Sequence, residues 1–157
     1  MNKIPMTASG YEKLQEELKK LINEDRPNII AAIAEARSHG DLSENAEYQY
    51  AKEQQSLIEG KIQELESISG LAEIIDISQL SGKEIKFGAT IEIEDNDSGI
   101  KSKYQIVGEY ESDINNKKLS INSPLARGLI GKTKDDIVEV VSPKGTKSYS
   151  VLSVKFI

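Results

Sequence analysis

The chain has no cysteine, no tryptophan and a single histidine among its 157 residues. Without cysteine it can form neither disulfides nor thiolate metal sites, and one histidine makes a zinc site implausible. Hard cations such as Mg²⁺, which carboxylates bind, are compatible with this composition.

Long hydrophobic runs are also missing. No stretch of about 18 or more consecutive apolar residues occurs, and the N-terminus lacks the charged segment, apolar core and small-residue cleavage site of a signal peptide. We therefore expect a cytoplasmic protein that makes no membrane contact.

Positive charge is scarce in the first half of the chain. Residues 1–76 contain 8 Lys and Arg against 15 Asp and Glu, whereas residues 77–157 contain 12 against 11, and the whole chain has a net charge of −6. An acidic first half is poorly suited to lying along nucleic acid. The charge favours a protein partner, or the delivery of acidic groups to a site that needs a cation.

Apolar residues recur at steps of three and four on both sides of residues 40–48, which predicts two helices joined by a short turn. Such helices are expected to pack as an antiparallel coiled coil. The 29 residues from Tyr11 to His39 would form an arm about 43 Å long at roughly 1.5 Å each, so its end would lie clear of any compact domain. The expected seam residues are Leu14, Leu18, Leu21, Ile22, Ile29, Ile33 and Ala36, followed by Tyr48, Ala51, Gln55, Ile58, Ile62 and Leu65.

Local signals set the expected limits of the first helix. Thr7 or Ser9 is a suitable N-cap, and Gly40 is suited to the residue that follows the helix. Pro27 removes a backbone donor and predicts a disturbance near Asn23. Because the apolar stripe resumes beyond it, we expect a bend rather than a break.

The second helix is expected to start at Asp41 or Ser43 and to end near Ile68. Gly60 falls inside it, at a cost of about 1 kcal/mol relative to alanine unless close packing needs the space.

From Ile74 onward the periodicity changes to that of short strands separated by turn signals. Ser123 followed by Pro124 predicts one short helix among these strands. We expect an α+β protein, with a helical hairpin over residues 1–76 and a small antiparallel β domain over residues 77–157. The expected strands cover residues 74–77, 90–94, 103–107, 119–121, 138–141 and 147–156.

Two acidic residues, Asp41 and Glu44, stand three positions apart at the expected tip, and two interpretations remain open. In the first they form a capping box at the start of the second helix. In the second they are ligands for a Mg²⁺ that keeps most of its waters, which needs further ligands from a partner because two carboxylates alone bind Mg²⁺ weakly.

The neighbouring side chains allow similar alternatives. Leu42 either packs on the hairpin or contacts a partner, and Tyr48 either packs in the seam or meets a ligand with its hydroxyl. Arg37 and Lys52, expected on opposite helices, form either a solvated pair of charges or a joint site for a polyanion. His39 is expected to be a helix-end residue rather than a catalytic base.

The sequence Gly-Asp-Leu-Ser-Glu-Asn-Ala-Glu-Tyr at residues 40–48 resembles the tip of the bacterial Gre family of transcript cleavage and elongation factors. The similarity runs in register over nearly the whole chain. It also covers residues 4–7, 26–27, 34–37, 51–55, 87–89 and 122–131.

This resemblance implies an antiparallel coiled coil followed by a domain like the FK506-binding proteins. It implies that the coiled coil enters the secondary channel of bacterial RNA polymerase and stimulates cleavage of the 3′ end of backtracked RNA. The hydrolytic activity would be the polymerase's own, so the chain would be an accessory factor and not an enzyme. The partners implied are the polymerase and the nascent RNA, with DNA reached only indirectly, and we expect a monomer.

The resemblance also assigns roles to residues. Asp41 and Glu44 match acids that help the polymerase hold its second Mg²⁺ and a water, with no metal bound by the isolated chain. Arg37 and Lys52 match basic positions that contact the RNA, although lysine is a point charge where some family members carry arginine. The remaining matches are the tip-supporting residues Leu42, Ser43, Asn45 and Tyr48 and the polymerase-docking residues Ser123, Pro124 and Leu125.

Three other functions remain as alternatives. An inhibitory relative could occupy the same channel without stimulating cleavage. A prolyl isomerase is disfavoured because such sites are lined with aromatic residues, and this chain has two phenylalanines and no tryptophan. If the chain were a plain coiled-coil dimerisation module, replacement of the tip acids Asp41 and Glu44 would have no measurable effect.

Overall fold

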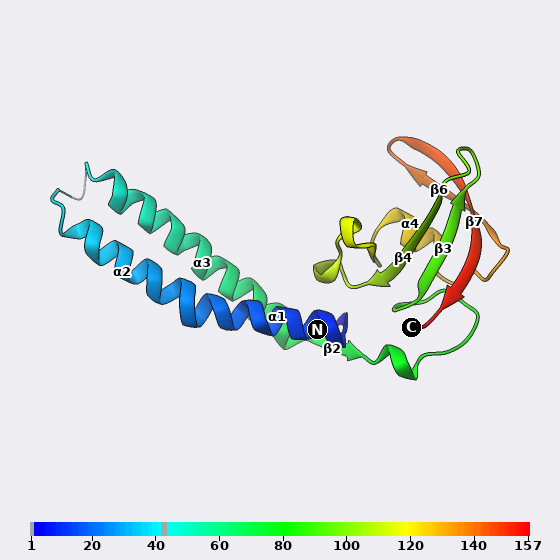
Figure 1. The fold of residues 1–157 in the computed structure, drawn as a ribbon, viewed down its shortest axis with the longest axis horizontal. Helices are drawn as coiled ribbons and strands as arrows, with labels where there is room; N and C mark the ends of the chain where they lie inside the picture. The colour runs from blue at the N-terminus through cyan, green and yellow to red at the C-terminus, as the bar shows by residue number, and fades with distance from the viewer. Residues whose placement is uncertain (1, 42–43) are drawn as a thin grey trace. The chain divides into compact units, whose positions relative to one another are not determined.

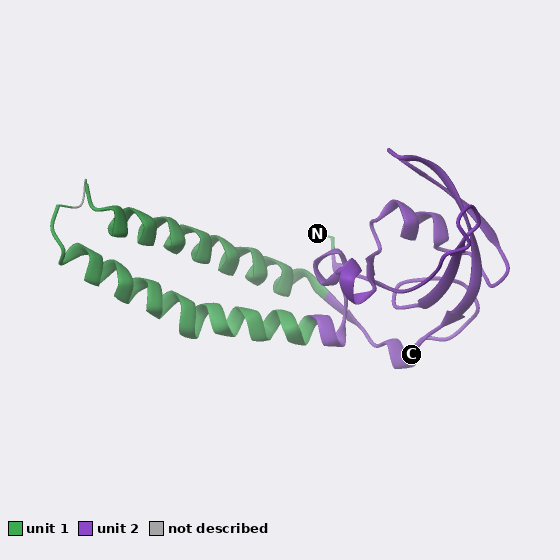
Figure 2. Cartoon of the chain, turned by 45° about the horizontal axis from the view of Figure 1, so that its top comes forward, with its two compact units in different colours: residues 1–2, 11–72 green, residues 3–10, 73–157 purple. Residues whose placement is uncertain are grey.

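The structure is a computed structural model, and it describes residues 2–41 and 44–157. The chain divides into two compact units (Figure 2). The first unit is built around residues 11–72, and the second comprises residues 3–10 and 73–157. The division expected from the sequence placed residues 3–10 with the helical hairpin, whereas the structure places them with the second unit.

The first unit is a helical hairpin (Figure 1). Its second arm is one continuous helix, and its first arm is helical without interruption from Ala8 to Arg37. Thr7 accepts a hydrogen bond from the N–H of Gly10 through its Oγ1 atom at 3.0 Å, which confirms Thr7 as a cap of the first helix. The helical segments are α1 (Ala8–Lys20), the π-helical turn η1 (Leu21–Asp25), α2 (Arg26–Arg37) and α3 (Ala46–Leu71).

The π-helical turn η1 lies where Pro27 predicts a disturbance. In an α-helix, residues seven positions apart lie on the same face, because seven residues make about two turns. The apolar residues Leu21 and Ile29 are eight positions apart, so regular α turns would place them on different faces. The N–H of Arg26 bonds to the carbonyl of Leu21, five residues back, and such a turn takes up one extra residue. The apolar stripe therefore stays on the inner face on both sides of the proline.

The two arms run in opposite directions, as three cross-arm contacts show. Near the base Gln15 donates to the hydroxyl of Ser69 at 2.6 Å, and halfway along Arg26 makes two 2.8 Å hydrogen bonds to Glu59. At the tip Asn45 bonds to the backbone of α2. The sequence separation of the partners falls steadily toward the tip, as in any hairpin.

Only part of the expected seam is buried, because two helices alone cannot enclose every apolar side chain. Leu18, Ile29 and Ile33 are half-buried. Ile68 is also buried, although it was not among the expected seam residues, and the buried members of the expected seam are Leu14, Leu21, Ala36, Ala51, Ile62 and Leu65.

The second unit holds a five-stranded sheet with the strand order β5-β4-β3-β7-β6. Expected and observed strands differ mainly by one or two residues at their ends, and the chain is confirmed as mixed α and β. The strands are β3 (Thr90–Asp95), β4 (Lys101–Val107), β5 (Lys118–Ser120), β6 (Ile137–Ser142) and β7 (Gly145–Lys155), with short 3₁₀ turns η2 (Ile77–Gln79), η3 (Glu109–Glu111) and η4 (Ile114–Asn116).

The expectation of a purely antiparallel sheet is wrong, because β4 pairs with β5 in parallel while the other pairs are antiparallel. The turns η3 and η4 carry the chain back to Gln105, so that β5 runs beside the last three residues of β4. A parallel pair needs such a crossover.

Residues 3–10 belong to the second unit through a short strand and one carboxylate. Strand β1 (Ile4–Thr7), which sequence analysis missed, pairs with β2 (Ala72–Ile75). Glu111 accepts hydrogen bonds from the backbone N–H groups of Thr7 and Gly108 at 3.0 Å and from the hydroxyl of Thr7.

The helix α4 (Pro124–Leu129) covers the sheet and starts as predicted, because the hydroxyl of Ser123 accepts from the N–H of Ala126 at 3.2 Å. Ala126 and Leu129 are fully buried against the sheet. The core around them consists of Ile85, Ala89, Ile91, Ile93, Ile106, Leu119, Val138, Val140 and Val151.

Candidate functional site at the hairpin tip

Asn45 organises the tip. Its side-chain oxygen accepts from the N–H of Tyr48 at 3.1 Å and caps α3, while its amide nitrogen donates to the carbonyl of Ala36 at 2.6 Å. One amide thus satisfies an end group of each helix. Its predicted role in supporting the tip rests on this double contact, and no feature of the sequence signals the bond to Ala36.

The second helix starts later than expected. Asn45 occupies the N-cap position of α3, so neither Asp41 nor Ser43 does. The capping-box interpretation of Asp41 and Glu44 is therefore wrong, because a box at this helix would have to begin with Asn45.

The side chains of Asp41 and Glu44 lie in the connection between the two helices, and both residues are exposed. Carboxylate oxygens are the ligands that Mg²⁺ prefers, so the donor chemistry fits this ion. In residues 2–41 and 44–157 no group of three or more His, Cys, Asp or Glu side chains is arranged to hold a metal. Two carboxylates by themselves supply only part of the octahedral set of ligands that Mg²⁺ takes.

Two predicted tip residues, Leu42 and Ser43, lie outside the described residues. Tyr48, the other predicted supporting residue, is half-buried at the start of α3. His39 approaches Glu47, with 3.0 Å between Nδ1 and Oε2, so it contacts the first turn of the opposite helix.

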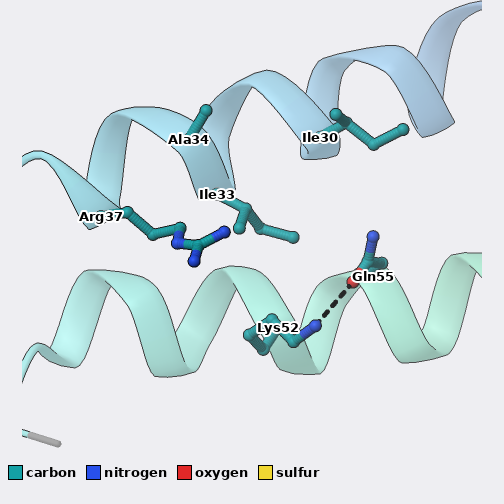
Figure 3. Close-up of a pocket in the computed structure, with 6 residues that line it drawn as sticks. All are labelled: Ile30, Ile33, Ala34, Arg37, Lys52 and Gln55. Atoms are coloured by element: carbon teal, nitrogen blue, oxygen red, sulfur yellow. Dashed lines mark hydrogen bonds between the residues drawn. The ribbon is translucent and has the colours of Figure 1, made fainter. Parts of the chain in front are cut away.

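Arg37 of α2 and Lys52 of α3 line one groove between the two helices, with a volume of about 300 Å³ (Figure 3). Lys52 donates to the side-chain oxygen of Gln55 at 3.1 Å, and the Arg37 guanidinium lies over the gap between the helices. Within the described part of the chain, no ion pair neutralises either cation. The groove also has an apolar wall formed by Ile30, Ile33 and Ala34.

This arrangement brings Arg37 and Lys52 to one place, as their expected positions on opposite helices require. Sequence analysis assigned none of the other lining residues to this site, although it placed Ile33 and Gln55 in the seam. One signal was available, because Gln55 is the single polar residue in an otherwise apolar stripe, and in the structure it orients Lys52.

The predicted docking residues Ser123, Pro124 and Leu125 lie in the second unit, at the start of α4. Pro124 is exposed and Leu125 is half-buried, while the hydroxyl of Ser123 is engaged in capping the helix. Of the three, Pro124 is therefore the one whose surface is most available to another protein.

Comparison with known sequences defines the class of the protein. Residues 4–74 match the family model described as "Transcription elongation factor, N-terminal", and residues 80–156 match "Transcription elongation factor, GreA/GreB, C-term". The chain belongs to the GreA/GreB family of transcription elongation factors, which confirms the resemblance found in its sequence.

Individual relatives narrow this class to proteins named GreA. Over its full length the chain is 53% identical to the transcription elongation factor GreA of Caulobacter sp. (strain K31), which is also fully covered. It is 57% identical to that of Rickettsia conorii, over 98% of this chain and 95% of the relative.

Among solved structures, the crystal structure of GreA factor homolog 1 (Gfh1) of Thermus thermophilus is 27% identical, with a TM-score of 0.46 over 98% of this chain and 99% of the other. No helix in the described part of the chain combines the length and hydropathy that a membrane span requires.

Proposed function

We propose that this chain rescues backtracked elongation complexes by inserting the hairpin tip into the secondary channel of bacterial RNA polymerase. There the carboxylates of Asp41 and Glu44 would help to hold the second Mg²⁺ and a water. The observation that carries this proposal is the exposure of two hard-oxygen ligands at the closed end of a helical hairpin.

Hydrolysis of a phosphodiester by two metals needs one ion to activate water and one to stabilise the leaving oxygen. In this proposal Asp41 and Glu44 supply ligands and orient a water, while the polymerase supplies the remaining ligands and the chemistry. The chain is therefore an accessory factor and not itself an enzyme. Asn45 acts as a positioning residue, because its bonds to Ala36 and Tyr48 hold the ends of the two helices together next to Glu44.

The groove between the helices is suited to the extruded 3′ segment of the RNA. Arg37 and Lys52 face it from opposite arms, so a phosphate within it would meet positive charge from both sides. Lysine acts there as a point charge, whereas arginine can form a planar, bidentate contact. DNA would be reached only indirectly, through the elongation complex.

The finer details of the fold and its location belong to the same proposal. The hairpin would pack as an antiparallel coiled coil, and the second unit would have the fold of the FK506-binding proteins. That unit would dock on the polymerase through Ser123, Pro124 and Leu125, with Pro124 the most accessible of them. We expect a cytoplasmic monomer.

The test is a halted, backtracked transcription complex with labelled RNA, supplied with Mg²⁺ and the full chain. Wild type should release short 3′ fragments, and the double variant Asp41→Asn, Glu44→Gln should reduce the release rate at least about tenfold, since both ligands lose their charge. The matched control is Glu16→Gln, Glu17→Gln, which removes two exposed charges far along the chain from the tip.

Binding to the polymerase is measured in parallel by co-sedimentation, and it should survive in both double variants. Equal cleavage by wild type and the tip variant would refute the proposed role of the acids. Slower elongation without any fragment release would instead identify an inhibitory occupant of the channel.

A further inference from the structure

Three lysines of the second unit line a groove that the tip chemistry does not use. Lys83, Lys134 and Lys155 surround a space of about 530 Å³, together with the hydroxyl-bearing residues Thr133 and Ser153. Of the described residues that line it, none is acidic. The groove thus presents ammonium and hydroxyl donors and no carboxylate.

A second groove in the same unit has the same character. Lys103, Lys117 and Lys118 line a space of about 430 Å³, with the amides of Gln105 and Asn116 beside them. Its described lining again includes no acidic side chain. Two separate parts of the unit therefore offer the same chemistry.

The two grooves adjoin across strand β3. Thr90, which lines the second groove, is in register with Lys155 of the first groove on one side. On its other side Thr90 is in register with Gln105 of the second groove. The two grooves are therefore neighbours on the sheet, and their six lysines are here called the lysine surface.

The positive charge of the lysine surface is not neutralised by ion pairs with the described residues. Lys117 lies over the ring of Tyr104 at 5.9 Å, and Lys118 donates to Gln105, but both contacts leave the charge in place. Glu92, in register with Lys103 and Ser153, is the acid that the strand register places at this surface.

We propose that the lysine surface binds the phosphodiester backbone of a nucleic acid strand without reading its sequence. Lysine is depleted in the cores of protein–protein interfaces, whereas interfaces with nucleic acids are polar and strongly positive. The charged groups that line both grooves are lysines, which act as point charges suited to phosphates, and the half-buried ring of Tyr104 is the aromatic face in the described lining.

The width of the surface fits a short strand. Neighbouring strands of a sheet lie about 4.8 Å apart, so the three steps from β5 to β7 span about 14 Å. This distance corresponds to about four phosphates of one strand at 3.4 Å of axis each. The lysine surface lies wholly within the second unit, so the inference does not depend on the role proposed for the tip.

The experiment measures binding of the full chain to fluorescein-labelled RNA and DNA of about 20 nucleotides by anisotropy, between about 50 and 200 mM KCl. For four phosphate contacts on a single strand, the slope of log K against log salt should be about −3. The triple variants Lys83→Gln, Lys134→Gln, Lys155→Gln and Lys103→Gln, Lys117→Gln, Lys118→Gln should each lower the association constant at least about tenfold at the lowest salt.

A matched variant separates this surface from net charge. Lys13→Gln, Lys19→Gln, Lys144→Gln removes the same charge elsewhere and should change affinity less than about twofold. Glu92→Gln should strengthen binding, since it removes a negative charge beside Lys103.

Circular dichroism confirms that each variant is folded. A triple variant of the lysine surface that loses no more affinity than the matched control triple would overturn the proposal. Tighter binding to a polyglutamate peptide than to either nucleic acid would also overturn it and would identify an acidic protein as the partner.

Discussion

The side-chain amide of Asn45 donates to the backbone carbonyl of Ala36 at 2.6 Å, so the last turn of one helix is bonded directly to the residue that starts the next. Ala36 is itself buried, with 3% of its surface exposed. The residue that directly follows Glu44 is therefore bonded to a buried residue of the opposite helix.

Replacement of Asn45 by alanine removes both the cap of α3 and the bond to Ala36. We expect the hairpin to lose about 1–2 kcal/mol of unfolding free energy, measured by urea unfolding followed through helical circular dichroism. Asn45→Asp is the matched control, because it keeps the capping oxygen and loses only the donor. Its stability should fall between wild type and alanine, and an alanine variant as stable as wild type would contradict the role of this residue.

Replacement of Gly60, which lies inside helix α3, should stabilise the hairpin. A methyl group added there meets no atom within 4 Å, so the close-packing reason for glycine at this position is absent. Gly60→Ala should raise the stability of the hairpin by about 1 kcal/mol through backbone entropy and helix propensity. The comparison variant is Gly40→Ala, whose backbone φ of 126° disfavours any L-residue, and which should be destabilised in the same urea titration.

The cross-arm pair of Arg26 and Glu59 should make hairpin stability depend on pH. The hydrogen bonds from Arg26 hold the pKa of the Glu59 carboxyl below its ordinary value. A lowered pKa contributes stability that is present above the unfolded value and is lost as pH falls through the folded value. Wild type should therefore exceed Glu59→Gln in stability near about pH 7, and the gap should narrow as the pH falls from the ordinary glutamate pKa, about 4.3, through the lowered value.

The effect of this pair should be small and weakened by salt, since both side chains are partly exposed. Glu64→Gln, which breaks a contact between neighbouring turns of one helix, controls for the loss of one negative charge. A gap between wild type and Glu59→Gln that stays constant with pH would contradict the assignment.

Gly108 has a backbone conformation open to any residue, with φ of −68°, yet it has no space for a side chain. An added Cβ would collide with the backbone carbonyl of Pro5, which cannot rotate away. Gly108→Ala should destabilise the second unit by about 1–3 kcal/mol and free the segment that contains β1, as amide hydrogen exchange would show. Gly70→Ala, with nothing within 4 Å of its added methyl, should lack this effect.

Local signals in the sequence were enough to place most elements of the fold. Helix α4 could be predicted because Ser123 and Pro124 are a cap and a first-turn residue in the right order. Alternating apolar residues located the strands of the sheet, since every second side chain faces the core. The continuous first arm was also predictable, because the apolar stripe resumes after Pro27.

The features that could not be predicted from the sequence depend on contacts with distant residues, or on a choice among several residues that are equally good caps. Strand β1 is four residues long, and its partner β2 lies more than sixty residues away. At the tip Asp41, Ser43 and Asn45 are all good capping residues. Asn45 is the one whose amide also donates to the carbonyl of Ala36, and that second bond exists only once the hairpin has closed.

The wide turn at Leu21–Asp25 means that the two arms need not match residue for residue. In a helix made only of α turns, one additional residue rotates everything beyond it by about 100°. Here the π-helical turn absorbs that rotation halfway along the arm, so the one additional residue between Leu21 and Ile29 leaves the orientation of the far end unchanged. Arg37 therefore keeps the facing toward the groove that the apolar stripe nearer the base sets.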